Sequence, residues 1–154
     1  MLNVLIIEDD SFKYDNISEF LKSQFNKIHI DKATNLYDAM QNISKTNYEL
    51  ILVDMSIPSH PITPGSGSPI NLLDGGIEII VQLKLRNEFA DCIIVTQYPE
   101  VEICGESYPI KDVKKALHDF LDIKIIGCIQ YMDGSNEWKF EIREMLRQYE
   151  NFNS

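Results

Sequence analysis

Short apolar runs alternate along the chain with stretches in which apolar residues recur every three or four positions. The runs are rich in β-branched residues, as strands buried on both faces of a sheet are, and cover residues 4–7, 28–30, 50–53, 93–95 and 125–129. Between the second and third runs, Leu36, Ala39, Met40 and Ile43 have the i, i+3, i+4, i+7 spacing of a helix that buries one face. The pattern therefore predicts strands that alternate with helices.

Four further stretches show helical spacing, around residues 17–21, 77–86, 113–121 and 138–149. Asp10 or Ser11, Asn35 and Asn136 stand where N-caps are expected before three of these five helices. Five strands in strict alternation with five helices favour an α/β fold, in which right-handed crossovers build a three-layer, doubly wound parallel sheet.

The chain has 154 residues, which corresponds to a single domain over residues 1–154. Two segments interrupt the compact plan: an extended loop at about 57–74, with four of the six prolines, and a second long loop at about 97–109. Both follow strands, so we expect both at the carboxyl edge of the sheet, where ligands bind in such folds. A functional role and a neutral insertion both remain open for them.

Charge and composition narrow the possible functions. The formal net charge is −10, which argues against nucleic-acid binding because phosphates are neutralised by positive surfaces. No apolar run approaches the roughly 18 residues of a membrane span. The N-terminus lacks the basic and small-residue features of a signal peptide, and the three cysteines form no CxxC motif. We therefore expect a cytoplasmic protein with reduced thiols and no membrane partner.

Acidic residues stand at the ends of two predicted strands. Glu8 and Asp9 follow the first strand and Asp54 follows the third, and these strands are neighbours in a doubly wound sheet. Three carboxylates in one cleft repel each other unless a cation lies among them, and Mg²⁺ prefers such oxygen ligands. The alternative is that these acids are solvated turn residues. Thr96 ends the fourth strand beside this cleft, and Tyr131 near the fifth is, by itself, more typical of packing.

The segments VLIIEDD, ILVDMSIP, IIVTQ and IIGCIQYM, in this order, resemble the CheY-like receiver domain of bacterial two-component response regulators, over roughly residues 2–150. The resemblance implies a flavodoxin-like five-stranded sheet of order 2-1-3-4-5. It implies that Asp54 is the phosphoacceptor, and that Mg²⁺ is held by Glu8, Asp9, Asp54 and the backbone carbonyl of Ser56, with Asp9 a direct ligand. By the same resemblance Thr96 is the switch hydroxyl, Tyr131 the switch aromatic and Gly76 the glycine that opens the third helix.

The chain also departs from the receiver pattern. Receivers usually carry a lysine three residues after the switch aromatic, and here that position is Gly134. Glycine has no side chain with which to bind a phosphoryl group, whereas a lysine ammonium acts there as a point charge. Lys139 is too far along the last predicted helix to replace it, and Lys111 is a further candidate. The sequence therefore predicts slow phosphorylation that couples poorly to the switch residues.

Three functions follow from these features. The first is a stand-alone receiver, not an enzyme, that takes a phosphoryl group from a histidine kinase or phosphotransfer protein in a phosphorelay. Its output would pass to a downstream protein partner or through a homodimer. Lys111, Lys114 and Lys115 are either a docking patch for this purpose or a solvated helix face. The second is a pseudo-receiver, a protein-interaction module independent of phosphorylation. The third, a Mg²⁺-dependent phosphatase, is disfavoured because Ser56 stands where the general acid is needed.

Overall fold

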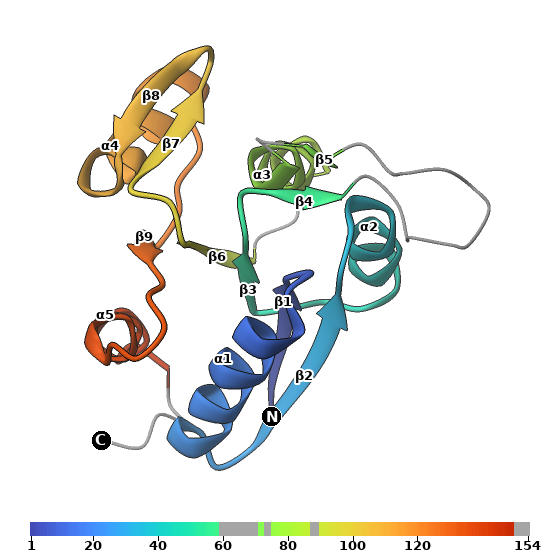
Figure 1. Cartoon of the computed structure of the whole chain (residues 1–154). Coiled ribbons are helices and arrows are strands. Elements are labelled where there is room, and N and C mark those ends of the chain that lie inside the picture. Colours follow the sequence, from blue (N-terminus) through green and yellow to red (C-terminus); the bar gives the residue numbers. More distant parts are fainter. Residues whose placement is uncertain (59–70, 73–74, 87–89, 150–154) are drawn as a thin grey trace, which may run out of the picture.

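Five parallel strands form the central sheet of the computed structural model, which describes residues 1–58, 71–72, 75–86 and 90–149 (Figure 1). The strands are β1 (Leu2–Ile7), β2 (Ile28–Ala33), β3 (Leu50–Val53), β6 (Asp91–Thr96) and β9 (Gly127–Gln130). Their order is β2-β1-β3-β6-β9, so the first and third strands of the chain are neighbours. This confirms the predicted order 2-1-3-4-5 of a doubly wound sheet.

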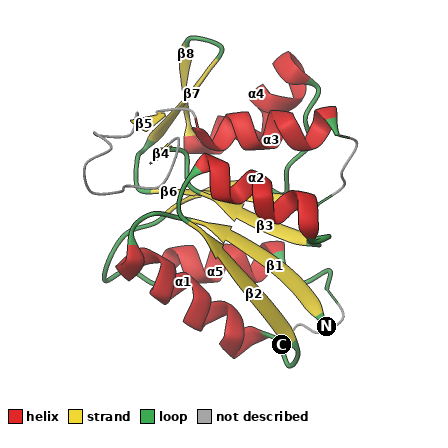
Figure 2. Cartoon of the chain, turned by 90° about the vertical axis from the view of Figure 1, so that its right-hand side faces the viewer, coloured by secondary structure: helices red, strands yellow, loops and turns green. Residues whose placement is uncertain are grey.

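Helices cover both faces of this sheet, as Figure 2 shows. They are α1 (Ser11–Gln24) and α5 (Glu137–Met145) on one face, and α2 (Leu36–Lys45), α3 (Gly75–Leu85) and α4 (Ile110–Leu121) on the other. Because side chains of a strand alternate between faces, Ile6 packs toward α1 and α5, whereas the next residue, Ile7, packs toward α2 and α3. The predicted three-layer α/β architecture is therefore confirmed.

Polar side chains fix where the first two helices begin. The Asp10 carboxylate accepts a hydrogen bond from the Lys13 amide at 3.0 Å, and the Asn35 side chain accepts one from the Asp38 amide at 2.8 Å. Such caps satisfy amides that lack a partner within the helix. Asn136 precedes α5 as predicted, but its side chain forms no cap hydrogen bond.

Both segments that interrupt the sequence pattern contain extra strands. Within 57–74, β4 (Ile57–Pro58) pairs antiparallel with β5 (Asn71–Leu72), and residues 59–70 and 73–74 lie outside the described part. Within 97–109, β7 (Glu100–Ile103) and β8 (Glu106–Pro109) form an antiparallel hairpin, turned by Cys104 and Gly105 at φ 53° and 83°. Two positive φ values are typical of the tight turns that join such strands. The hairpin buries its apolar face against α4 (Figure 1).

Candidate functional site

A cluster of carboxylates lies where β1 and β3 end. The Glu8 amide donates to Ala33 O at 2.9 Å and the Asp54 amide to Ile7 O at 3.0 Å, so the sheet hydrogen bonding continues to both residues. Oxygen atoms of Glu8, Asp9 and Asp54 all lie within 4.8 Å of one another. Glu8 and Asp54 are each only 2% exposed, whereas Asp9 is exposed. The structure thus brings together the three acids that the sequence singled out.

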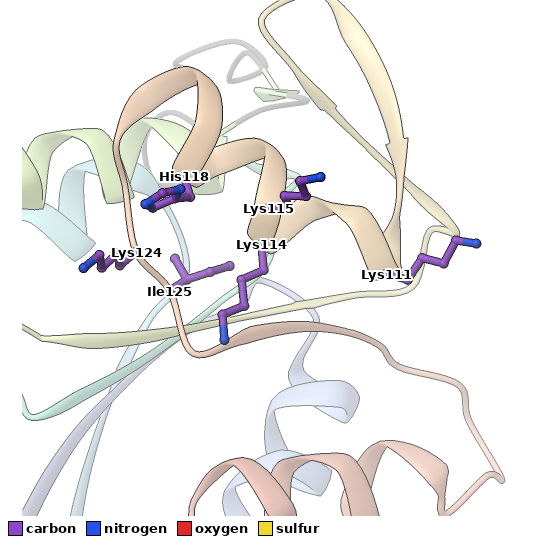
Figure 3. Close-up of a pocket in the computed structure, with 6 residues that line it drawn as sticks. All are labelled: Lys111, Lys114, Lys115, His118, Lys124 and Ile125. Carbon is purple, nitrogen blue, oxygen red and sulfur yellow. The ribbon is translucent and has the colours of Figure 1, made fainter.

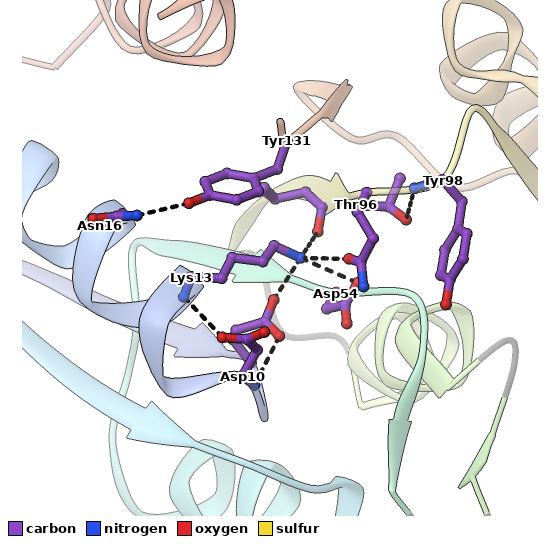
Figure 4. A network of polar contacts seen from close by, with 10 residues as sticks. Asp10, Lys13, Asn16, Asp54, Thr96, Tyr98 and Tyr131 are labelled. Carbon is purple, nitrogen blue, oxygen red and sulfur yellow. Dashed lines mark hydrogen bonds and ion pairs between the residues drawn. The ribbon is translucent and has the colours of Figure 1, made fainter. Parts of the chain in front are cut away.

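A lysine that sequence reasoning missed lies inside this cluster. The ammonium group of Lys13, in the first turn of α1, is 2.6 Å from Glu8 Oε1 and 3.4 Å from Asp54 Oδ1 (Figure 4). The same nitrogen donates to Val95 O at 3.0 Å and to Gln97 Oε1 at 3.2 Å. Lys13 is 3% exposed, which is rare for lysine unless it is paired.

One signal in the sequence could have revealed this lysine. Position 13 precedes Ile17 by four residues and Phe20 by seven, so helical spacing places it on the same apolar face. Both of these apolar residues are buried. A lysine on the buried face of a helix that starts beside an acidic pair indicates an internal ion pair.

Burial controls the electrostatics of the acids. Desolvation raises the pKa of Glu8 from 4.5 to about 7, with Lys13 opposing this rise and Asp54 adding to it. Desolvation also raises the pKa of Asp54, again against the opposing charge of Lys13, while Asp9 raises it further. One lysine therefore does not compensate the three carboxylates, and a further cation would stabilise their ionised forms.

The donor set fits a magnesium ion. Asp54 Oδ1 is buried and accepts no hydrogen bond from the described residues, so a buried oxygen lacks a partner. Glu8 is more fully engaged, since Oε1 pairs with Lys13 and Oε2 accepts from the Asp10 amide at 3.1 Å. Carboxylate oxygens are the ligands that Mg²⁺ prefers. Asp9 and Asp54 are thus the residues best placed to hold the ion directly.

The backbone after Asp54 is fixed by α3. The amide of Gly76, near the start of this helix, donates to Met55 O at 3.2 Å. A Cβ atom at position 76 would lie 2.6 Å from Asp54 O, closer than non-bonded atoms approach. A side chain at position 76 would therefore force the backbone to shift, because the helix packs directly on the end of β3. Ser56 is half-buried, and the metal-binding role of its carbonyl stays a prediction.

The two predicted switch residues are buried beside the cluster (Figure 4). The Thr96 hydroxyl accepts a hydrogen bond from the Tyr98 amide at 3.2 Å, so in this state it is engaged at the start of the hairpin segment. The Tyr131 amide donates a hydrogen bond to Thr96 O at 2.8 Å, and the Tyr131 hydroxyl accepts one from Asn16 Nδ2 at 2.8 Å. Its ring lies 5.1 Å from that of Trp138. Tyr131 is thus held inward, and a direct hydrogen bond joins it to Thr96.

No family model matches the chain, but individual proteins do. It is 32% identical over 149 residues to the Detocs response regulatory protein DtcB of Vibrio alginolyticus. This match covers 94% of this chain and 99% of that protein. It is 21% identical over 143 residues to the uncharacterized protein y4jR of Sinorhizobium fredii, covering 92% and 95%.

Solved structures match the fold at lower identity. The response regulator TrrA of Thermotoga maritima, in complex with Mg²⁺ and beryllium fluoride, has a TM-score of 0.58 at 18% identity, over 95% of this chain and 100% of that one. A CheY-like receiver domain of Methanospirillum hungatei has a TM-score of 0.61 at 17% identity, over 94% and 92%. Both likenesses concern the fold. None of the helices in the described part combines the length and hydropathy needed to cross a membrane.

Proposed function

Since this chain belongs to the response-regulator receiver family, we propose that it is a receiver that accepts a phosphoryl group on Asp54. One observation carries the proposal: the buried Asp54 has an oxygen without a hydrogen bond among the described residues, inside a carboxylate cluster that fits Mg²⁺. A buried carboxylate oxygen without a hydrogen-bond donor keeps an unshared lone pair, with which it can bind a cation or attack an electrophile.

The proposed transfer is a nucleophilic substitution at phosphorus. A carboxylate oxygen of Asp54 attacks the phosphoryl group of a phosphohistidine or an acyl phosphate, and a new O–P bond forms as the bond to the leaving group breaks. The leaving imidazole or carboxylate keeps the bonding electron pair. The Asp54 carboxylate is consumed and an acyl phosphate is formed on the protein.

Mg²⁺ belongs to this proposal as a bound cofactor. Asp9 and Asp54 would hold it, with Glu8 and the Ser56 carbonyl contributing as the family resemblance implies. The ion supplies neutralisation of charge on the phosphoryl oxygens. The chain itself buries the acceptor and keeps Glu8 fixed through its bonds to Lys13 and the Asp10 amide.

The proposed partners are proteins. A histidine kinase or phosphotransfer protein would donate the phosphoryl group in a cytoplasmic phosphorelay, and a downstream protein or a second copy of the chain would receive the signal. We propose no nucleic-acid binding, in keeping with the net charge of −10, and also no enzymatic output and no membrane contact.

A pseudo-receiver is the second candidate function. The observation that favours it is the Lys13–Glu8 ion pair, because a resident cation already neutralises part of the cluster without metal or phosphate. Such a protein would keep the fold and dock its partner without any phosphoryl transfer.

Intact mass after incubation with acetyl phosphate and Mg²⁺ separates the two functions. We expect a phosphoryl adduct that hydroxylamine removes, that requires Mg²⁺, and that Asp54→Asn abolishes. Asp15→Asn, an exposed acid on α1, serves as the matched control and keeps the adduct. An adduct that persists in Asp54→Asn would overturn the acceptor assignment, and its absence from wild type with both acetyl phosphate and phosphoramidate would favour the pseudo-receiver.

A further inference from the structure

The receiver pattern needs a cation near the phosphoryl group, and the described part of the chain offers few candidates. Gly134 has no side chain. The Lys139 ammonium lies over the Trp138 ring at 5.5 Å from its centre, and Lys111 lines a surface hollow on α4. Among the described residues, Lys13 is the cation that forms an ion pair with Asp54, at 3.4 Å.

The contacts of Lys13 show how its ammonium group is used. It has three N–H donors, which face Glu8 Oε1, Val95 O and Gln97 Oε1. Asp54 Oδ1 lies nearby at 3.4 Å without a hydrogen bond. A group added to Asp54 would therefore appear beside a buried positive charge that is already anchored.

The geometry points to Lys13 as the phosphoryl-binding cation of this protein, supplied by α1 in place of the lysine that receivers carry at the position of Gly134. This inference rests on the proposed function of Asp54. Before transfer, the ammonium group is the counter-ion of Glu8 and Asp54. After transfer, it binds an oxygen of the new phosphoryl group, since charge-assisted bonds to phosphate are stronger than those to neutral oxygens. The slow phosphorylation that Gly134 predicts is then not expected.

The anchors of Lys13 give the same residue a second consequence. Val95 O and Gln97 Oε1 flank Thr96 at the end of β6, and the Tyr131 ring centre is 5.7 Å from the ammonium nitrogen. Gln97 O also accepts from Gln130 Nε2 at 3.1 Å, which ties it to β9. Movement of the ammonium toward a phosphoryl group breaks at least one of these bonds. The end of β6 is thereby released when Asp54 is phosphorylated.

Lys13→Met tests this inference because it keeps the apolar stem and removes the charge. We expect adduct formation with acetyl phosphate to become at least tenfold slower. Binding of Mg²⁺ alone, measured by calorimetry, should become severalfold tighter, because a competing cation leaves the carboxylates. If Lys13 had a purely structural role, its loss would lower both the rate of adduct formation and the affinity for Mg²⁺. Lys13→Arg should restore much of the rate, and Lys22→Met, an exposed lysine on the same helix, should change neither.

A second pair of variants keeps the test valid if Lys13→Met does not fold, because breaking a buried ion pair strongly destabilises a protein. Glu8→Gln/Lys13→Met removes both charges, and the comparison of this double variant with Glu8→Gln alone tests the same role of Lys13. If Lys13→Met forms the adduct as fast as wild type, and the double variant as fast as Glu8→Gln, the role of Lys13 is overturned and the proposed function stays intact. No adduct in wild type overturns the proposed function and, with it, the phosphoryl-binding role.

Discussion

Glu8 is a buried carboxyl group whose two oxygens are both engaged before any ligand arrives. Oε1 pairs with the Lys13 ammonium at 2.6 Å and Oε2 accepts from the Asp10 amide at 3.1 Å. Burial nevertheless dominates, and the pKa of Glu8 is about 7 in the folded protein. This single residue therefore makes the stability of the metal-free protein depend on pH.

The sign follows from proton binding. The folded protein binds a proton at Glu8 more tightly than the unfolded chain, whose pKa is near 4.5, so the stabilisation is complete below pH 4.5 and is lost as the pH rises through 7. Asp54 acts in the same direction. We expect the free energy of unfolding without divalent ions to fall by on the order of 2 kcal/mol between pH 5 and 7.5, measured by urea denaturation.

Glu8→Gln should remove much of this slope, whereas Glu19→Gln, an exposed glutamate on α1, should leave it unchanged. A wild-type profile that rises or stays flat over this range, or the same slope in Glu8→Gln, would contradict the assignment.

Helix α3 packs directly on the backbone of Asp54. Its contact is made by backbone at Gly76, where an added Cβ would meet Asp54 O at 2.6 Å. Backbone cannot move aside as the end of a side chain can, so the start of α3 and the position of Asp54 are coupled. Any side chain at position 76 must displace one of them.

Gly76→Ala tests this coupling. Alanine favours a helix by about 1 kcal/mol over glycine, but overpacking costs about 1–3 kcal/mol, and here the clash is with backbone. We expect net destabilisation of about 1 kcal/mol in urea denaturation and a slower rate of Asp54 phosphorylation. Gly127→Ala is the matched control, because its Cβ would meet the flexible end of Met145. Equal stability and equal phosphorylation rates in the two variants would exclude the coupling.

The whole molecule carries a charge contrast between one helix and the rest of its surface. The net charge is −10, yet α4 and the segment after it line a hollow of about 550 Å³ with basic residues (Figure 3). The basic residues are Lys111, Lys114, Lys115, His118 and Lys124, and Ile125 also lines the hollow. Complementary charge steers association, so we expect this basic hollow to favour docking of an acidic protein surface, such as that of a second copy.

Reversal of three charges tests the docking role of the hollow. Sedimentation at low ionic strength should show self-association of wild type that weakens as salt is added. Lys111→Glu/Lys114→Glu/Lys115→Glu should weaken it at least tenfold. Lys22→Glu/Lys27→Glu/Lys45→Glu makes the same change in net charge at exposed positions elsewhere and should have a smaller effect. Equal sedimentation of all three proteins would leave the lysines as a solvated helix face.

The sequence by itself determined the order of elements and the acidic cluster. Apolar runs and helical spacing depend on local period, and strands that alternate with helices have few ways to cover a parallel sheet. Once β1 and β3 are neighbours, Glu8 and Asp54 must meet at their carboxyl ends. The family resemblance then assigned roles to these residues from four short motifs.

Tertiary structure decided what lies among those acids. Helical spacing places Lys13 on the apolar face of α1 but does not identify its partners, one of which, Val95 O, is 82 positions away. The hairpin at 97–109 likewise depends on α4, because its short strands bury their apolar side chains against that helix. Local patterns specify the elements, whereas a buried charge is stable only where distant parts of the chain supply oxygens around it.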